Sequence, residues 1–409
     1  MASPRAIPVL ALALGLAGSA GGCTTVDAGS DDDTLDGPEP TTAEALSLPV
    51  AQGPLTFTDP CRPGTRITIA ALGDVLLHSP LQKQAYTAED GHHSLWRGAE
   101  PLIKQADLAY ANFEGPSAAG TTATGATVRD PGKVFDGVVY TSYPMFNYHG
   151  SLVASLLESG IDVVSTANNH SLDRRSAGAD RTIAALTAGG LPFTGTRPAD
   201  EPARPWHVVT ERNGVRVAWI ACTYGTNGIP DAKKQVLLCF QQTSEIEEVI
   251  KGLRSRGEAD AVIVTPHWGN EYEHNPSADQ KKLAHRLLDA GATAIVGNHP
   301  HVLQPWEKHL TPDGREGFVV YSLGNFVSGQ TALARKTTIV LYLGLTRGAD
   351  GKVTVNGVRH VPLTMRSWTV EPSDKAQGAT ESHRLATQIF GKWNEMASTE
   401  RLDTTPSCR

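Results

Sequence analysis

Apolar runs at strand spacing alternate along the chain with segments whose apolar residues recur at helical spacing. A β-rich run, RITIAALGD, begins at Arg66, and residues 147–160 then carry apolar residues at helical spacing up to a glycine. Residues 161–170 have the pattern of the next strand, and residues 175–190 that of a second helix, which also ends in glycines. Strands that alternate with helices in this way predict a layered α/β fold.

The second half of the chain continues this alternation and adds antiparallel features. Asn213-Gly214 lies between two β-rich runs, which is the strongest short signal for a hairpin. Helical segments at 243–257 and 277–291 each lead into an apolar strand, and β-rich runs from 337 to 370 precede a helical tail near 379–394. A mixed sheet, or two stacked sheets, is therefore expected in place of a single parallel sheet.

The composition is that of an ordinary globular protein and narrows the classes of function. The 409 residues are 40% hydrophobic and 19% charged, which allows a sizeable core. The formal net charge of −7 argues against a nucleic-acid-binding protein, because such proteins normally present a basic face. Beyond the amino terminus, no apolar run approaches the roughly 20 residues that a bilayer span requires.

The amino terminus has the layout of a secretory signal. Arg5 precedes an apolar stretch from Ile7 to Ala17, and small residues then lead to Cys23. This ending resembles the lipobox of bacterial lipoproteins, in which the cysteine is lipidated, although the residues before Cys23 lack the usual leucine. A membrane-anchored lipoprotein that faces outside the cell is expected, and a plain secreted protein is the alternative.

Three regions follow from this pattern. Residues 1–23 are the expected signal peptide, and residues 24–60 contain a stretch rich in Asp, Thr, Gly and Pro and poor in aromatic residues. Such a stretch cannot bury enough apolar surface to offset its ordering entropy, so it is expected to be a flexible tether. Residues 61–409 are the expected folded domain.

The remaining cysteines suggest disulfides, because their number is even and the chain is expected to be exported. The four residues, which permit three pairings, are Cys61, Cys222, Cys239 and Cys408. Cys222 and Cys239 flank one loop, whereas Cys61 and Cys408 bracket the globular region. We favour these two pairings, and the spacing does not suggest a zinc finger.

Five of the expected strands end in residues that can bind a metal ion. These residues are Asp74 in LGDVLLH, Asn112 and Glu114 in ANFEGP, Asn168, Asn169 and His170 in TANNH, His267 in TPHWGNE, and His299 and His301 in GNHPH. In layered α/β folds, the loops beyond the carboxyl ends of the strands form the functional crevice. Residues 115–146, rich in Gly, Thr and Ser, are expected to form a loop or insertion near it.

Each segment alone has a structural explanation, such as a helix cap after Asp74 or a turn at Asn168–His170. His299 and His301 form the strongest pair, because alternate residues of an extended segment point to the same side. Together the five segments predict a metal-binding crevice. Carboxylates mixed with imidazoles suit Mn, Fe, Zn or Co, and two ions that share one carboxylate are expected.

Several of these segments carry a family resemblance. GDVLLH, ANFEGP, DVVSTANNHSLD, HWGNEY, GNHPHVLQP and YSLGNF resemble the signature segments of the CapA/PgsA family of capsule or poly-γ-glutamate synthesis proteins, in that family's order, over residues 66–328. The family is related to the calcineurin-like metallophosphoesterases. The resemblance therefore implies a four-layer αββα sandwich with a dinuclear metal centre.

The resemblance also implies roles for individual residues. Asp74 and His301 would bind the first metal ion, and Glu114 would bridge the two ions where the phosphoesterases use Asp. The second ion would be bound by Asn169, His267 and His299. His170 would be the acid that protonates a leaving group, or would stabilise the transition state, with its pKa set by a nearby carboxylate such as Asp173.

The first motif departs from the superfamily pattern. The phosphoesterases have a ligand histidine two residues after the first Asp, whereas this chain has Leu76 there. His78 lies two residues further on and is the candidate substitute. Without a ligand at this position, the first site would be weak or the centre mononuclear, so phosphatase activity does not follow from the fold. Further residues expected to line the crevice are Asn112, Asn168, Glu271, Tyr272 and Asn325.

Two functions remain open. The first is a membrane-tethered, metal-dependent hydrolase or transferase that acts on a phosphoester or on the γ-glutamyl amide of an anionic polymer. The second is a non-catalytic component that binds polymer during capsule assembly, together with membrane proteins of capsule synthesis. The net charge of −7 requires a local metal ion or basic spot for any contact with a polyanion.

Overall fold

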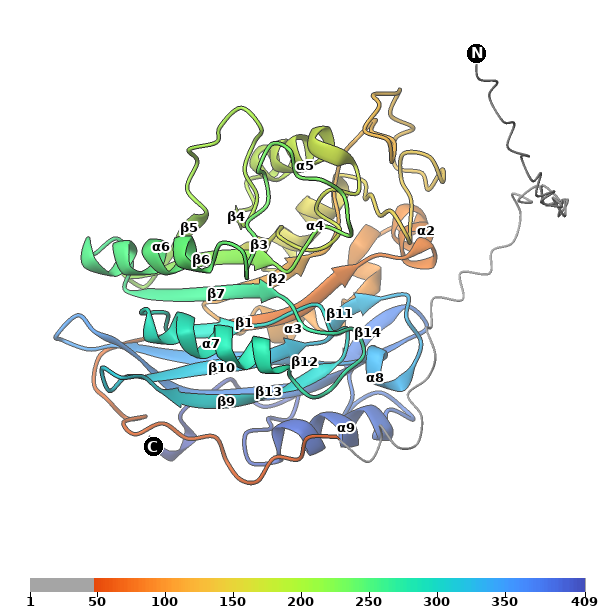
Figure 1. Cartoon of the computed structure of the whole chain (residues 1–409). Coiled ribbons are helices and arrows are strands. Elements are labelled where there is room, and N and C mark those ends of the chain that lie inside the picture. Colours follow the sequence, from red (N-terminus) through yellow and green to blue (C-terminus); the bar gives the residue numbers. More distant parts are fainter. Residues whose placement is uncertain (1–47, 409) are drawn as a thin grey trace, which may run out of the picture. The chain divides into compact units, whose positions relative to one another are not determined.

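Two β-sheets organise residues 48–408, which are the part of the chain that the computed structural model describes (Figure 1). The larger sheet has eight strands in the order β14-β13-β12-β1-β2-β3-β4, with β11 paired to β1. Its strands are β1 (Thr65–Leu76), β2 (Leu108–Phe113), β3 (Val163–Ser165), β4 (Phe193–Thr194), β11 (Asn325–Ser328), β12 (Thr337–Arg347), β13 (Val353–Arg366) and β14 (Thr369–Pro372).

The smaller sheet has six strands in the order β5-β6-β7-β8-β10-β9. Its strands are β5 (His207–Arg212), β6 (Val215–Thr223), β7 (Ala261–His267), β8 (Ala294–Val296), β9 (Leu303–Leu310) and β10 (Glu316–Leu323). Both sheets mix parallel and antiparallel pairs: β1 is parallel to β2 and antiparallel to β12, and β6 is parallel to β7 and antiparallel to β5. The expectation of stacked mixed sheets is confirmed.

Helices cover the outer face of each sheet (Figure 1). The helices on the larger sheet are α2 (Ser79–Thr87), α3 (Glu100–Ile103), α4 (Ser151–Glu158) and α5 (Arg175–Gly189). Those on the smaller sheet are α6 (Thr243–Ser255) and α7 (Ala278–Asp289). Residues 48–408 also contain helix α9 (Thr380–Phe390) and the short helices α8 (Leu333–Lys336), η1 (Gly91–Leu95) and η2 (Pro406–Cys408). The architecture is the four-layer αββα sandwich that the resemblance implied.

The alternation of side chains along the strands builds the layers. On β1, Ile67 and Ile69 belong to the apolar cluster between the two sheets, whereas Ala70 and Leu72 belong to the cluster beneath the outer helices. A strand with both faces buried in this way reads as a continuous apolar run. Burial of both faces therefore explains why the central strands lack a polar face, whereas the edge strands β5 and β9 keep exposed polar residues.

Local signals in the sequence account for several boundaries. Asn213 and Gly214 have φ values of 54° and 72° and connect the antiparallel strands β5 and β6, as the two-residue hairpin signal predicts. Ser277 and Gln280 form a capping box at the start of α7. Residues 115–146 contain only isolated bridges, so this stretch is the expected loop insertion.

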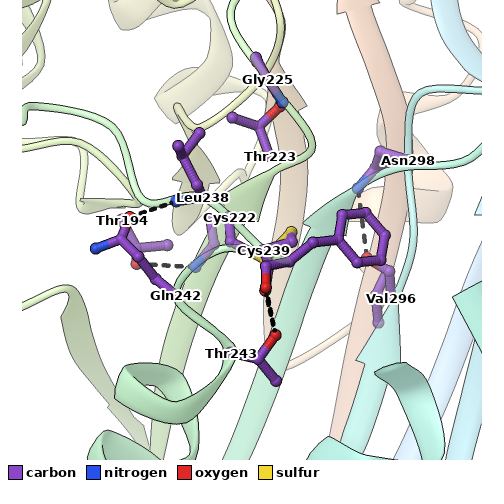
Figure 2. The surroundings of a disulfide bond; sticks show 12 residues. Thr194, Cys222, Thr223, Gly225, Leu238, Cys239, Gln242, Thr243, Val296 and Asn298 are labelled. Carbon is purple, nitrogen blue, oxygen red and sulfur yellow. Dashed lines mark hydrogen bonds between the residues drawn. A yellow bond between two sulfur atoms is a disulfide. The ribbon is translucent and has the colours of Figure 1, made fainter. Parts of the chain in front are cut away.

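Two disulfides lie within the described residues. Cys61 joins Cys408, and Cys222 joins Cys239. Figure 2 shows the second disulfide, which links the end of β6 to the segment before α6, where the Thr243 hydroxyl donates to the Cys239 carbonyl at 2.8 Å. The backbone N–H of Cys239 also donates to the Thr223 carbonyl at 2.8 Å, so this disulfide anchors the loop that follows β6.

The expected signal peptide, Cys23 and residues 24–47 of the expected tether lie outside the described residues. None of the helices within residues 48–408 combines the length and apolar character that a bilayer span requires.

Candidate metal centre

Three of the expected ligands meet where β3, β7 and β8 end, and we call Asn169, His267 and His299 the His267 cluster. His267 is the last residue of β7, while Asn169 and His299 lie in the loops after β3 and β8. The His267 Nε2 atom lies 2.8 Å from Asn169 Oδ1 and 3.1 Å from His299 Nδ1. All three side chains are buried.

A second group lies at the end of β1, and we call Asp74 and His301 the Asp74 cluster. Asp74 Oδ2 lies 3.2 Å from His301 Nδ1, and the Asn112 side-chain amide donates to Asp74 Oδ1 at 2.7 Å. Asn325 Oδ1 lies 3.0 Å from the same His301 nitrogen. The register of the larger sheet creates this group, because Asp74 pairs with Asn112 on β2 and with Asn325 on β11.

Glu114 lies between the two clusters. It follows β2 directly, and its Oε1 atom is 3.5 Å from His267 Nε2 and 4.0 Å from His301 Nε2. The carboxylate is fully buried, and neither of its oxygens has a hydrogen-bond partner among the described residues. A buried carboxylate without hydrogen bonds is costly, so this position calls for a positive charge beside it.

The donors therefore fit the metal centre that the family resemblance implies. Three groups of potential ligand atoms lie within 4.8 Å of one another in the described chain: Glu114 with His267 and His299, Asp74 with Glu114 and His301, and Glu271 with His299 and His301. Glu114 belongs to two of these groups, which suits a shared ligand. Imidazole nitrogens and carboxylate oxygens at this distance suit a borderline transition metal.

Electrostatics differ between the clusters. Burial lowers the pKa of His267 and His299 well below the usual range, and the neighbouring imidazoles lower it further. Burial would also lower the pKa of His301, but Glu114 and Asp74 outweigh it and raise that pKa to about 9. Burial, followed by repulsion from Asp74, raises the pKa of Glu114. The His267 cluster therefore holds neutral imidazoles, whereas the Asp74 cluster holds an acid–imidazolium pair.

The prediction that His299 and His301 share an extended segment and point to the same side is wrong. His299 and His301 do not lie in an extended segment, because their φ values are 103° and 58°, in the left-handed region. The chain turns sharply after β8 and sends the two imidazoles to different clusters. Gly297 permits this path, since a Cβ atom there would lie 2.0 Å from the Tyr321 carbonyl oxygen.

His170 is held by a carboxylate, as expected. Its Nδ1 atom lies 2.7 Å from Asp173 Oδ2, which also accepts the backbone N–H of Phe146 at 2.7 Å. The Phe146 ring meets the His170 ring edge-on with centroids 4.8 Å apart. Phe146 belongs to the 115–146 insertion, so the insertion packs against the expected catalytic histidine. The acid role itself stays a prediction.

The first motif lacks a substitute ligand. Leu76 is buried in the apolar cluster beneath the outer helices. His78 accepts the backbone N–H of Gly329 on Nδ1 at 2.9 Å, and it belongs to none of the three groups of potential ligands found in residues 48–408. The structure therefore does not place His78 with the other ligands.

The remaining crevice residues divide into two kinds. Asn168 holds the loop together, because its side chain donates to the Phe113 carbonyl and accepts the His170 backbone N–H. Glu271 is exposed beside His299 and His301, and the Tyr272 ring lies 6.1 Å from the His301 ring. Asn112 and Asn325, described above, position Asp74 and His301.

Tyr224 contacts the centre but was not expected from the sequence. Its ring lies 4.6 Å from the His299 ring, and its hydroxyl group donates to Asn227 Oδ1 at 3.4 Å. Burial, with the charges of Glu271 and Glu114, raises the pKa of Tyr224 to about 12. The residue follows β6 directly, so the rule that strand ends form the crevice could have found it.

The fold and the site define a two-sheet α/β protein with a candidate metal centre at the carboxyl ends of its strands. Residues 68–330, more than half of the chain, match the model of the family described as "Bacterial capsule synthesis protein PGA_cap". The chain belongs to this family. The resemblance found in the sequence segments is thereby confirmed.

Named relatives are similar over most of the chain. The "Capsule biosynthesis protein CapA" of Bacillus anthracis is 26% identical over 335 residues, which cover 81% of this chain and 75% of the relative. The "PGA biosynthesis protein CapA" of Bacillus subtilis (strain 168) is 27% identical over 310 residues, covering 76% of this chain and 74% of the relative.

Solved structures show a more distant likeness. The NAD nucleotidase (NadN) of Haemophilus influenzae aligns with a TM-score of 0.45 and 11% sequence identity. The alignment covers 84% of this chain and 59% of that protein, so this chain spans less than two thirds of its length.

Proposed function

We propose that this protein is a metal-dependent hydrolase or transferase that acts on an anionic polymer of the cell envelope. The bond attacked is a phosphoester or a γ-glutamyl amide. Membership of the capsule synthesis family supports the polymer setting. The observation that carries the enzymatic part is Glu114, a fully buried carboxylate without hydrogen bonds that lies between two clusters of potential ligands.

The cofactor in this proposal is a pair of divalent transition-metal ions, drawn from Mn, Fe, Zn and Co. Asp74 and His301 would hold the first ion, and the His267 cluster would hold the second. Glu114 would be a ligand shared by both ions. When bound, such ions supply Lewis acidity toward the scissile bond and an activated water molecule at neutral pH.

The protein's own groups would position the substrate and move the proton. Asp173 engages Nδ1 of His170, which leaves Nε2 as the nitrogen that protonates the leaving group. Phe146 packs against the same imidazole and limits its rotation. Tyr224 packs against His299 and so helps to keep that imidazole in place.

We further propose that the protein is exported and tethered to the outer face of the membrane through Cys23, with plain secretion as the alternative. The apolar stretch from Ile7 to Ala17 and the small residues before Cys23 support export. The two disulfides support it independently, because disulfides persist mainly in oxidising compartments. Membrane proteins of capsule synthesis are the partners that this location implies.

The altered first motif favours a second candidate function. Because Leu76 is an apolar core residue, the Asp74 cluster has fewer ligands than the superfamily pattern supplies. A centre that holds metal weakly suits a component that binds polymer during assembly without cleaving it.

The test combines elemental analysis with hydrolysis assays. Protein purified without chelator is analysed for bound metal and is then assayed on a panel of phosphoesters and on poly-γ-glutamate. His170→Asn is compared with His285→Asn, a change in a histidine of α7 on the outer face of the smaller sheet. We expect His170→Asn to retain the metal and to hydrolyse about 100-fold more slowly, as loss of a general acid implies.

The outcomes separate the two candidate functions. Equal rates for His170→Asn and His285→Asn would remove His170 from the mechanism. If metal-loaded protein binds polymer but cleaves nothing, the enzymatic function is rejected in favour of a non-catalytic role in assembly.

A further inference from the structure

A cavity of about 410 Å³ opens beside the candidate centre, between the residues after β11, the end of α8 and the turn from β13 to β14. Its volume lies in the range of small-ligand sites. Neither the sequence patterns nor the family resemblance pointed to it, because its walls come from segments that carry no metal-binding residue type.

Gln330 connects this cavity to the metal centre. It lines the cavity, donates from Nε2 to the Tyr272 hydroxyl at 3.2 Å, and accepts on Oε1 from the Asn325 side chain at 2.9 Å. Asn325 in turn contacts His301 at 3.0 Å, and the Tyr272 ring lies 6.1 Å from the His301 ring. The cavity wall is therefore separated from the centre by single side chains.

The lining is basic in a chain whose net charge is negative. Lys336 and Arg366 both line the cavity, and no acidic side chain from residues 48–408 does so. Lys336 has no ion-pair partner within residues 48–408, and Arg366 has one contact with Glu371, through Nη1 at 3.7 Å. At a net charge of −7, two cations that face one cavity mark a local preference for an anion.

The rest of the lining is part polar, from Gln330, Thr331 and Ser367, and part apolar, from Met365 and Trp368. Met365 and Trp368 contribute side chains that can pack against methylene groups, and Trp368 also packs on the apolar cluster beneath the outer helices. A cavity with two cations and a partly apolar wall fits a carboxylate with methylene groups next to it better than a free inorganic ion, because both features then contribute to binding.

We propose that this cavity is a subsite for one carboxylate-bearing unit of the anionic polymer, next to the bond at the metal centre. Lys336 and Arg366 pair with the carboxylate, Met365 and Trp368 contact its methylene groups, and Gln330 separates this unit from the reacting one. The inference rests on the proposed function, which supplies the polymer chemistry.

The test measures binding without turnover. A short γ-linked oligoglutamate is titrated calorimetrically into the full chain in chelator, and Lys336→Gln and Arg366→Gln are compared with Lys281→Gln, an exposed position on α7. We expect each cavity variant to raise the Kd about three- to tenfold, as loss of one partly screened ion pair implies, and Lys281→Gln to leave it unchanged. Lys336→Arg, which keeps the charge, should retain most of the affinity.

Further arms identify the ligand chemistry and separate this proposal from the enzymatic one. The methyl ester of the oligomer should bind more weakly than the free acid. Equal binding of the ester, equal binding of a glycerol-phosphate oligomer, or unchanged affinity in both cavity variants would overturn the subsite. If the wild-type protein binds oligoglutamate through Lys336 and Arg366 but hydrolyses nothing, the proposed hydrolase activity is wrong and the proposed subsite stands.

Discussion

In the His267 cluster, two imidazole nitrogens lie 3.1 Å apart, and both imidazoles have pKa values lowered by burial. In the Asp74 cluster, a carboxylate lies 3.2 Å from an imidazole whose pKa is raised to about 9. The Asp74 cluster can be neutralised without a metal ion, because protonated His301 carries a positive charge that balances the negative charge of Asp74. The His267 cluster contains no carboxylate among its three members, and burial disfavours protonation of its imidazoles, so it favours a metal ion over a proton as its cation. Two neighbouring clusters in one crevice thus place different demands on a metal ion.

The largest expected effect separates the clusters by metal content. His299→Ala should lose the tightly held metal and slow hydrolysis about 1000-fold, because it removes a ligand from the cluster that depends on the ion. His301→Ala should keep that ion, because His301 belongs to the other cluster and is not one of the ion's proposed ligands. Elemental analysis of chelator-free protein measures this, with His285→Ala as the control. Equal metal loss in both variants would contradict the difference between the clusters.

A second prediction concerns the pH dependence of stability in chelated protein. Between pH 6.5 and about 9, His301 is protonated in the folded state and neutral in the unfolded state, so the free energy of unfolding should fall as the pH rises, by about 1.4 kcal/mol per pH unit. Below pH 6.5, His267 and His299 stay neutral only when folded, so their contribution to stability should fall as the pH falls, whereas the raised pKa of Glu114 contributes in the opposite direction. Denaturant titrations across this range measure both limbs.

Variants assign each limb of that profile to one cluster. His301→Asn should flatten the upper limb, and His267→Asn should reduce the slope of the lower one. An upper limb that survives in His301→Asn would show that its proton resides elsewhere.

The smallest expected effect concerns His78. His78→Ala should leave the metal content unchanged, because this imidazole already accepts the Gly329 backbone N–H and lies in neither cluster. The substitution should lower the free energy of unfolding by about 1–3 kcal/mol, because the buried backbone N–H of Gly329 loses its acceptor. A variant that loses metal would instead make His78 the missing ligand of the Asp74 cluster.

The sequence carried most of the information about the fold and the expected ligands. Apolar runs, a hairpin dipeptide and the glycines after helices are local signals, and they located strands and helices to within a few residues. Asp74, Glu114 and His267 could be found because each is a metal-binding residue type directly at a strand end. That they would meet followed from the general geometry of parallel strands.

What the sequence concealed depends on register and on backbone turns. Tyr224 could be noticed as a strand-end residue, but its contact with His299 depends on β6 running beside β7 with Thr223 opposite His267, a pairing that no local pattern reports. The left-handed backbone at His299 and His301 could not be predicted from the sequence either, since histidine usually adopts other backbone conformations. The basic cavity combines Lys336 with Arg366 from separate elements, so only tertiary packing brings the charges together.

The disulfide between Cys61 and Cys408 has a consequence for damage tolerance. It closes a covalent ring around nearly all of the folded residues, including the exposed insertion between β2 and α4. A single protease cut anywhere inside that ring opens the backbone but releases no fragment. Both pieces stay attached, with their strands held at the high effective concentration that favours re-pairing.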